Sequence, residues 1–231
     1  MWINWNDLPE NMKNEQVRPY YEKLKQKRGS LITKRLFDIL VSLVMLILLS
    51  WLFLILAIAI KVDSHGPVFY RQVRVTTGNR DFRIFKFRTM VNNADKIGSL
   101  VTTGNDSRIT RVGAKIRKCR LDEIPQLLNI LKGEMSFVGT RPEVRKYVDR
   151  YTDEMMATLL MPAGVTSLAS ISFKDEDELI DEYTEKGMLV DDAYMEKVLP
   201  KKMKYNLEYM NQFGFFRDIK LMIQTFVSVI K

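Results

Sequence analysis

The stretch Leu36–Ile60, LFDILVSLVMLILLSWLFLILAIAI, is almost wholly apolar, and its polar interruptions are Asp38, Ser42 and Ser50. At about 1.5 Å per residue, a helix of this length is long enough for a bilayer core of roughly 30 Å. A core helix of a soluble protein is seldom apolar on every side over such a length. The stretch therefore predicts a membrane-embedded helix, which we place at residues 36–62.

Basic residues stand on both sides of this apolar run. Lys34 and Arg35 precede it, and Lys61 and several arginines follow it. Because Lys and Arg favour the cytosolic side, this distribution favours a re-entrant hairpin with both ends in the cytosol over a plain span. The break would fall at Ser50, whose hydroxyl can bond back to a carbonyl and bend a helix weakly. The run contains no proline.

Residues 1–35 form a polar arm before the apolar run. The arm contains Trp2 and Trp5 and then a cluster of basic residues. It is interpreted either as a mobile cytosolic tail or as an arm held on anionic lipid, where each basic residue adds on the order of 1 kcal/mol. We expect a mixture of the two, with the basic part at the membrane. The cluster comprises Lys23, Lys25, Lys27, Arg28, Lys34 and Arg35.

Composition restricts the chemistry. The chain has 231 residues and a formal net charge of +8, which indicates an anionic partner such as nucleic acid, acidic lipid or a phosphorylated substrate. Cys119 and His65 are the only residues of their kinds. An intrachain disulfide, a cysteine zinc cluster and a Ser-His-Asp or Cys-His system are therefore excluded, which leaves carboxylates as the catalytic candidates.

Two alternating segments follow the apolar run. Residues 68–75, VFYRQVRV, and 81–90, DFRIFKFRTM, alternate apolar and polar side chains around a turn at 77–79. This pattern predicts a β-hairpin. Its basic residues would form one basic face, or for each residue merely a solvated strand face. These residues are Arg71, Arg74, Arg83 and Lys86.

A loop is predicted at residues 99–108, and a basic helix at 111–120. The stretch Leu121–Glu143, LDEIPQLLNILKGEMSFVGTRPE, comes directly after this helix. Pro125 and Gly133 mark the start and end of a short helix between them, Gln126–Lys132.

Asp122 and Glu123 are adjacent at the start of this stretch. Carboxylates at a helix start are often only caps. Surrounded by cations and close to a membrane anchor, however, the pair suits a divalent metal and a diphosphate together, and hard oxygen ligands favour Mg²⁺. Arg141, in the turn before Pro142, is a candidate phosphate clamp or part of a turn stiffened by the proline.

The C-terminal part carries two further patterns. Phe213–Lys231 has apolar residues at helical spacing, for which core packing is the first interpretation and burial at a membrane interface the second. The acidic triplet Asp175–Asp177 is read as a solvated helix face rather than as a metal motif.

Several motifs in order resemble one family. KRLFD at residues 34–38, GPVF at 66–69, FKFRTM at 85–90, DEIPQL at 122–127 and GEMSFVGTRP at 133–142 are similar to the bacterial sugar transferases, the monotopic polyprenyl-phosphate phosphoglycosyl transferases. The resemblance extends from about Leu31 to the C-terminus. It implies an α+β fold, a mostly helical membrane-associated domain with a short β-hairpin and one N-terminal, re-entrant membrane helix.

The resemblance also implies a chemistry. Asp122 matches the nucleophile, which attacks the sugar-linked phosphorus of a UDP-sugar, releases UMP and passes the phosphosugar to undecaprenyl phosphate. Glu123 matches its partner, and both carboxylates serve the Mg²⁺ site. Residues 63–231 would be the catalytic domain, with amphipathic interfacial helices, on the cytosolic face of the bacterial inner membrane. The matching phosphate-binding positions are Lys86, Arg88, Arg117 and Arg141.

Three departures from the family pattern stand out. Ser50-Trp51 replaces the Ser-Pro of the helix break, Ser167–Phe173 replaces a substrate-contacting loop, and Asn206 takes the place of an aspartate in the tail. Two alternative functions stay open: a membrane-tethered nucleic-acid binder, with salt-sensitive binding, and a non-catalytic subunit of the same pathway. We expect a lipid bilayer and no nucleic acid as partners. The sequence leaves the sugar, the glycan and a homodimer undecided.

Overall fold

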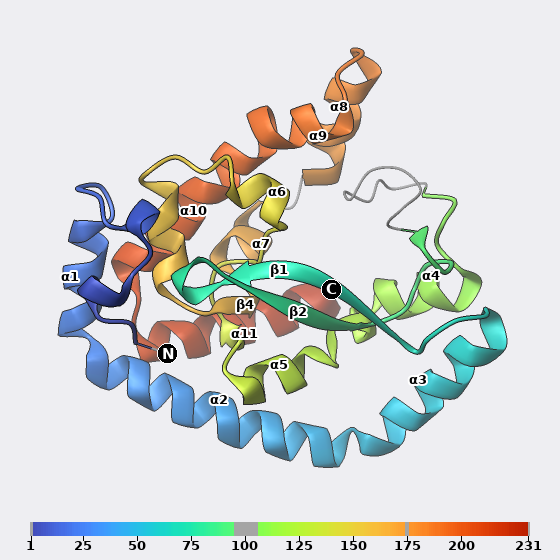
Figure 1. The fold of residues 1–231 in the computed structure, drawn as a ribbon. Coiled ribbons are helices and arrows are strands. Elements are labelled where there is room, and N and C mark those ends of the chain that lie inside the picture. Colours follow the sequence, from blue (N-terminus) through green and yellow to red (C-terminus); the bar gives the residue numbers. More distant parts are fainter. Residues whose placement is uncertain (1, 95–105, 174–175, 231) are drawn as a thin grey trace.

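The computed structural model describes residues 2–94, 106–173 and 176–230. Helices surround two small sheets, so the predicted α+β class is confirmed (Figure 1). Most of the loop predicted at 99–108 lies outside the described residues, as does Asp175 of the acidic triplet.

The apolar run forms two helices. α2 (Arg28–Leu48) and α3 (Ser50–Asp63) meet at a bend of 63°. The Ser50 hydroxyl donates a hydrogen bond of 2.9 Å to the carbonyl of Ile47, which is the predicted bond back to the preceding turn. Within the residues that the structure describes, no helix alone has the length and apolar content for a membrane crossing, and α2 and α3 pass this test only as a bent pair.

Both basic residues before the apolar run have internal roles. Lys34 is 4% exposed, and its Nζ donates to the carbonyl of Val138 at 2.8 Å and pairs with Asp218 at 2.5 Å. Arg35 donates to two carbonyls in the last turn of α5 (Gln126–Lys132), one of them Leu131 at 2.8 Å. The expectation that these two residues lie on lipid headgroups is therefore wrong, because internal acceptors occupy them.

The N-terminal segment is not a mobile tail. It forms a helix, α1 (Arg18–Gln26), preceded by two single turns of 3₁₀ helix. Met12, Val17 and Leu24 are buried in the main hydrophobic core. The tail interpretation failed because apolar side chains spaced along a polar segment still have enough area to bury when they meet a core.

The predicted β-hairpin is confirmed. β1 (Phe69–Thr76) pairs antiparallel with β2 (Arg80–Phe87). The single basic face is wrong, however. Arg74 and Lys86 lie on one face, and Arg71 and Arg83 on the other, as the pairs Tyr70↔Lys86 and Val73↔Arg83 show. A spacing of three residues along a strand changes the face, because side chains alternate with a period of two.

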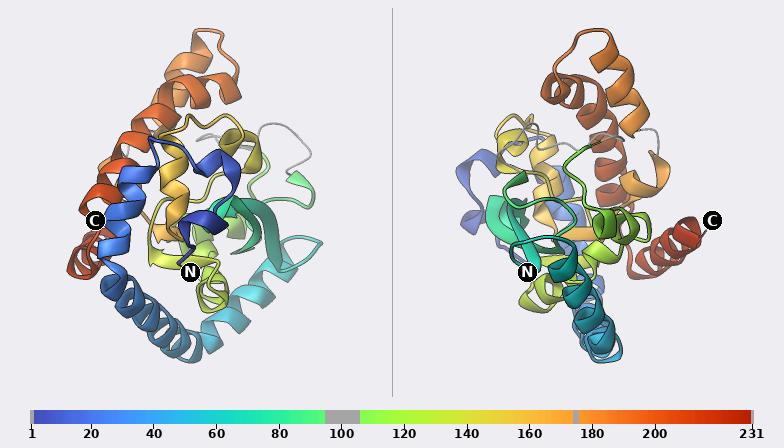
Figure 2. Two further views of the ribbon diagram at one scale, coloured as in Figure 1. Left: turned by 60° about the vertical axis from the view of Figure 1, so that its left-hand side comes forward. Right: turned by 90° about the vertical axis from the view of Figure 1, so that its right-hand side faces the viewer.

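A second sheet and short helices build the centre. β3 (Met135–Val138) runs parallel to β4 (Ala163–Thr166). α8 and α9 lie at the end of the molecule opposite the bend between α2 and α3 in all views (Figures 1 and 2). The remaining α-helices of the described residues are α4 (Arg111–Lys118), α5 (Gln126–Lys132), α6 (Arg145–Val148), α7 (Leu168–Ser172), α8 (Glu176–Glu185), α9 (Val190–Ala193), α10 (Leu199–Gln212) and α11 (Phe215–Ile230).

The C-terminal helix α11 is only half covered. Leu221 is buried in the main core, whereas Phe216 is 86% exposed and Phe226 and Ile223 are also exposed. Core packing therefore accounts for one side of this helix, and the other side presents an apolar face.

Candidate active site

The two adjacent carboxylates lie on a short turn between two helices. Thr110 caps the start of α4, and Arg120, two residues after the end of this helix, adopts a left-handed conformation with φ 52°. A 3₁₀ turn, Leu121–Glu123, then carries both acids, and Pro125 leads into α5 as predicted. The reversal at Arg120 turns the chain so that both carboxylates face the hairpin.

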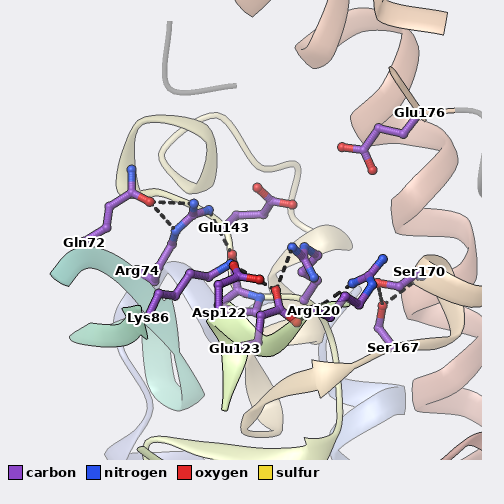
Figure 3. A network of polar contacts seen from close by, with 12 residues as sticks. Gln72, Arg74, Lys86, Arg120, Asp122, Glu123, Glu143, Ser167, Ser170 and Glu176 are labelled. Atoms are coloured by element: carbon purple, nitrogen blue, oxygen red, sulfur yellow. Dashed lines mark hydrogen bonds and ion pairs between the residues drawn. The ribbon is translucent and has the colours of Figure 1, made fainter. Parts of the chain in front are cut away.

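Glu123 is surrounded by cations. Its Oε1 lies 3.0 Å from Lys86 Nζ and 3.4 Å from an Nη of Arg141, and its Oε2 lies 3.9 Å from an Nη of Arg120. Figure 3 shows Lys86 from the hairpin and Arg120 from the turn beside this carboxylate. Burial raises the pKa of Glu123, but the three cations outweigh burial and bring its pKa down to about 2.

Asp122 has fewer partners. Its Oδ2 lies 3.8 Å from Lys86 Nζ, which is beyond hydrogen-bond distance. Burial raises the pKa of Asp122, opposed by Lys86, and the neighbouring charge of Glu123 raises that pKa further. The two carboxylates are thus unequal: Glu123 is a fixed anion, and Asp122 is left with an oxygen that no cation holds.

Of the four cations predicted for phosphate binding, Lys86 and Arg141 contact Glu123 directly. Arg117 projects from α4 near the site, and its charge lowers the pKa of Asp122 without an ion pair. The site thus gathers basic residues from β2, from α4 and from the segment after β3.

The structure does not bring Arg88 to the carboxylates. Its guanidinium is buried and donates to the carbonyls of Ser64 at 2.6 Å and His65 at 3.0 Å, at the end of α3. Gly66 makes room for it, because a Cβ at that position would lie 1.9 Å from an Nη of Arg88. Arg88 therefore caps a helix, and its assignment to phosphate binding is corrected. The sequence suggested phosphate binding because Arg88 directly follows β2, the strand that carries Lys86.

A second polar network lies beside Arg141. Lys202 Nζ lies 3.2 Å from Glu143 Oε1, 3.2 Å from Glu176 Oε1 and 2.8 Å from the hydroxyl of Tyr194. Burial raises the pKa of Glu143, but the charges of Lys202 and of Arg74 outweigh it and lower that pKa.

Sequence reasoning missed this second network. Arg74 donates to the carbonyl of Pro142 at 3.1 Å, and the hairpin register places it on the same face as Lys86. Glu143 stands next to the predicted turn. No pattern in the sequence points to Tyr194 or Lys202, because only the folded chain brings them near.

The carboxylate pair offers oxygen ligands that could bind Mg²⁺. No cluster of three or more acidic, His or Cys side chains is found in the described part of the chain. Mg²⁺ is nevertheless usually held by one or two carboxylates, with water and substrate phosphate oxygens completing the shell. Asp122 and the Oε2 of Glu123 fit that donor set, because neither has a cation within hydrogen-bond distance.

A half-buried carboxylate pair among converging cations is typical of an enzyme that handles phosphorylated substrates. The chain belongs to the bacterial sugar transferase family, whose sequence model matches residues 29–231.

Characterised relatives are consistent with this assignment. The chain is 36% identical over 200 residues to the UDP-N-acetylgalactosamine-undecaprenyl-phosphate N-acetylgalactosaminephosphotransferase of Aeromonas hydrophila, covering 85% of this chain and 43% of the relative. It is 34% identical over 201 residues to the UDP-glucose:undecaprenyl-phosphate glucose-1-phosphate transferase of Klebsiella pneumoniae, covering 85% and 40%. The exopolysaccharide production protein ExoY of Rhizobium meliloti is 32% identical over 213 residues, covering 86% and 85%. The chain thus spans less than half the length of the first two relatives.

Proposed function

We propose that this protein transfers a sugar-1-phosphate from a UDP-sugar to undecaprenyl phosphate and releases UMP, the first membrane step of a surface polysaccharide or glycoconjugate. The observation that carries the proposal is the inequality of the two carboxylates. Asp122 has one long ion pair, at 3.8 Å from Lys86, whereas Glu123 is held by Lys86 at 3.0 Å and by Arg141 at 3.4 Å. The weaker pairing leaves Asp122 the more available nucleophile. The names of the relatives supply the substrate class.

In the first step, an oxygen of Asp122 attacks the sugar-linked phosphorus of the donor. The bond from that phosphorus to the bridging oxygen breaks, and UMP leaves with the electron pair. In the second step, a phosphate oxygen of undecaprenyl phosphate attacks the same phosphorus. The acyl-phosphate bond breaks, Asp122 is regenerated, and the lipid carries the diphosphate-linked sugar.

The chain's own residues prepare this attack. Lys86 lies between the two acids and favours the ionised form of Asp122, which is the form that attacks. Arg141 and Arg117 add positive charge where negative charge accumulates on the phosphoryl oxygens. Mg²⁺, held by Asp122 and Glu123, would neutralise the diphosphate and make UMP a better leaving group.

The bent pair α2–α3 is the proposed membrane anchor, inserted as a re-entrant hairpin into the inner membrane from the cytosolic face. Large apolar side chains cover the outside of both helices, and they have no protein partner over most of their area. Among them are Leu36, Leu40, Ile47, Leu48, Trp51, Leu54 and Ile58. The exposed apolar face of α11 is the second proposed contact with the bilayer.

The single basic face on which nucleic-acid binding would rest does not form. A UMP-release assay distinguishes the proposed transferase from a non-catalytic subunit. Purified protein in lipid nanodiscs, given Mg²⁺, undecaprenyl phosphate and a panel of UDP-sugars, is expected to release UMP with one or a few of them. Omission of the lipid should limit release to about one UMP per enzyme. Failure of the whole panel, with a folded protein and active relatives run beside it, would favour the non-catalytic subunit.

The topology gives a further prediction. Cys119, the native cysteine, is exposed and is first replaced by serine. Single cysteines are then introduced at Glu15 and at Lys197, both on the surface. Since basic residues flank the bent helix on both sides, both positions are expected to react with a membrane-impermeant maleimide only after spheroplasts are opened. Reaction at position 15 in intact spheroplasts would show that the helix spans the membrane.

A further inference from the structure

Arg120 adopts a backbone conformation that an arginine seldom adopts. Its φ of 52° and ψ of 23° lie in the left-handed region, where Gly and Asn are at ease and other residues carry a cost of order 1 kcal/mol or more. The conformation is held by hydrogen bonds from the Arg120 amide to Arg117 at 2.9 Å and from the Glu123 amide to the Arg120 carbonyl at 3.2 Å. Gly or Asn would adopt this backbone conformation at a lower cost. The presence of arginine here therefore points to a role for its side chain.

The side chain of Arg120 is the most loosely held cation around Glu123. Its closest nitrogen lies 3.9 Å from Glu123 Oε2, against 3.0 Å for Lys86 and 3.4 Å for Arg141. It is also the most exposed of the three, at 51% against 23% and 35%. An exposed ion pair at this distance contributes little to stability. Arg120 therefore loses little when it leaves Glu123.

A diphosphate is a stronger partner for such a guanidinium than one shared carboxylate. It offers several charged oxygens, and arginine binds phosphate through two parallel hydrogen bonds. Departure of Arg120 would also free Glu123 Oε2, the oxygen that fits the metal.

We propose that Arg120 is a binding residue for the donor diphosphate, kept beside Glu123 in the free enzyme and transferred to the phosphate oxygens on binding. The inference rests on the proposed function, since that function supplies a nucleoside diphosphate-sugar as donor. It differs in that Arg120 is assigned a contact with the diphosphate that the sequence motifs do not indicate.

The test measures UDP binding by titration calorimetry at fixed ionic strength with Mg²⁺. Arg120→Asn keeps a residue that tolerates the left-handed conformation and removes the charge, and it is expected to bind UDP roughly tenfold more weakly. The matched control is Lys118→Asn, which removes an exposed charge two residues away, at the end of α4, and should change UDP affinity by no more than about twofold. Equal UDP affinity of Arg120→Asn and the wild type overturns the inference.

A double-mutant cycle with Glu123→Gln separates direct binding from support of Glu123. Direct binding predicts that Arg120→Asn weakens UDP binding at least as much in the Glu123→Gln background, because no pair with Glu123 must first be broken. Loss of the Arg120 effect in that background would mean that Arg120 only positions Glu123. A thermal unfolding midpoint of Arg120→Asn that is at or above that of the wild type would show that the variant is folded. Absence of UDP binding to the wild type would instead overturn the proposed function, and this inference with it.

Discussion

Asp122→Asn is expected to reduce UMP release by roughly three orders of magnitude or more, since it removes the oxygen proposed as the nucleophile. The protein should stay folded. Asp122 makes no hydrogen bond to Lys86, at 3.8 Å, and burial already disfavours its charge, so a neutral amide of the same shape costs the fold little. A thermal unfolding midpoint at or above that of the wild type is therefore expected.

The decisive measurement is intact mass after incubation with UDP-sugar and Mg²⁺ but without lipid. The wild type should gain the mass of a phosphosugar, and Asp122→Asn should not. Glu123→Gln is the comparison: its defect should be severe but partly relieved by higher Mg²⁺, because it disturbs metal binding rather than the attack. If UMP appears only with lipid present and no adduct is trapped, transfer is direct and Asp122 is a metal ligand.

Lys34→Met is expected to lower the free energy of unfolding by about 3–5 kcal/mol, the usual cost of removing one partner of a buried ion pair. Asp218, 4% exposed at its side chain, would lose the ammonium group 2.5 Å away. Asp38, which is buried and also interacts with Lys34, would lose the cation that most favours its charged form. Urea unfolding in detergent, followed by near-UV circular dichroism, measures the change.

Two controls make this prediction specific. Lys25→Met removes a lysine whose pair with Glu22, at 3.6 Å, is exposed, and it should change the free energy of unfolding by less than about 1 kcal/mol. The double variant Lys34→Met/Asp218→Leu should regain part of the loss, because Asp218 no longer remains as a buried unpaired charge, although Asp38 still lacks the Lys34 cation. A Lys34→Met protein as stable as the Lys25→Met protein would contradict the buried ion pair.

Local signals predicted local structure well. α5 runs from Gln126 to Lys132 as expected, because Pro125 and Gly133 act through their own backbone preferences. The break at Ser50 was likewise predictable, since the hydroxyl needs only a carbonyl of the preceding turn. The adjacent acids were identified correctly as the centre of a cationic site.

The failures share a physical cause, which is that a sequence does not state which distant groups will meet. Lys34 is paired with Asp218, and Glu143 with Lys202, and in both pairs the partners are distant in the sequence. Arg88 has the residue type and position of a phosphate ligand, yet its guanidinium donates to the carbonyls of Ser64 and His65 instead. A charged residue with no partner nearby in the sequence can therefore still be paired in the folded protein.

The bond from Lys34 to the carbonyl of Val138 joins α2 to the last residue of β3, and Arg141 follows only three positions later. If α2 lies in the bilayer and Arg141 binds phosphate, as proposed, the tilt of this helix is coupled to the position of that cation. Lipid chain length then becomes a kinetic variable: a thinner or thicker bilayer alters the turnover number without touching either substrate. The enzyme would work best in membranes of one thickness.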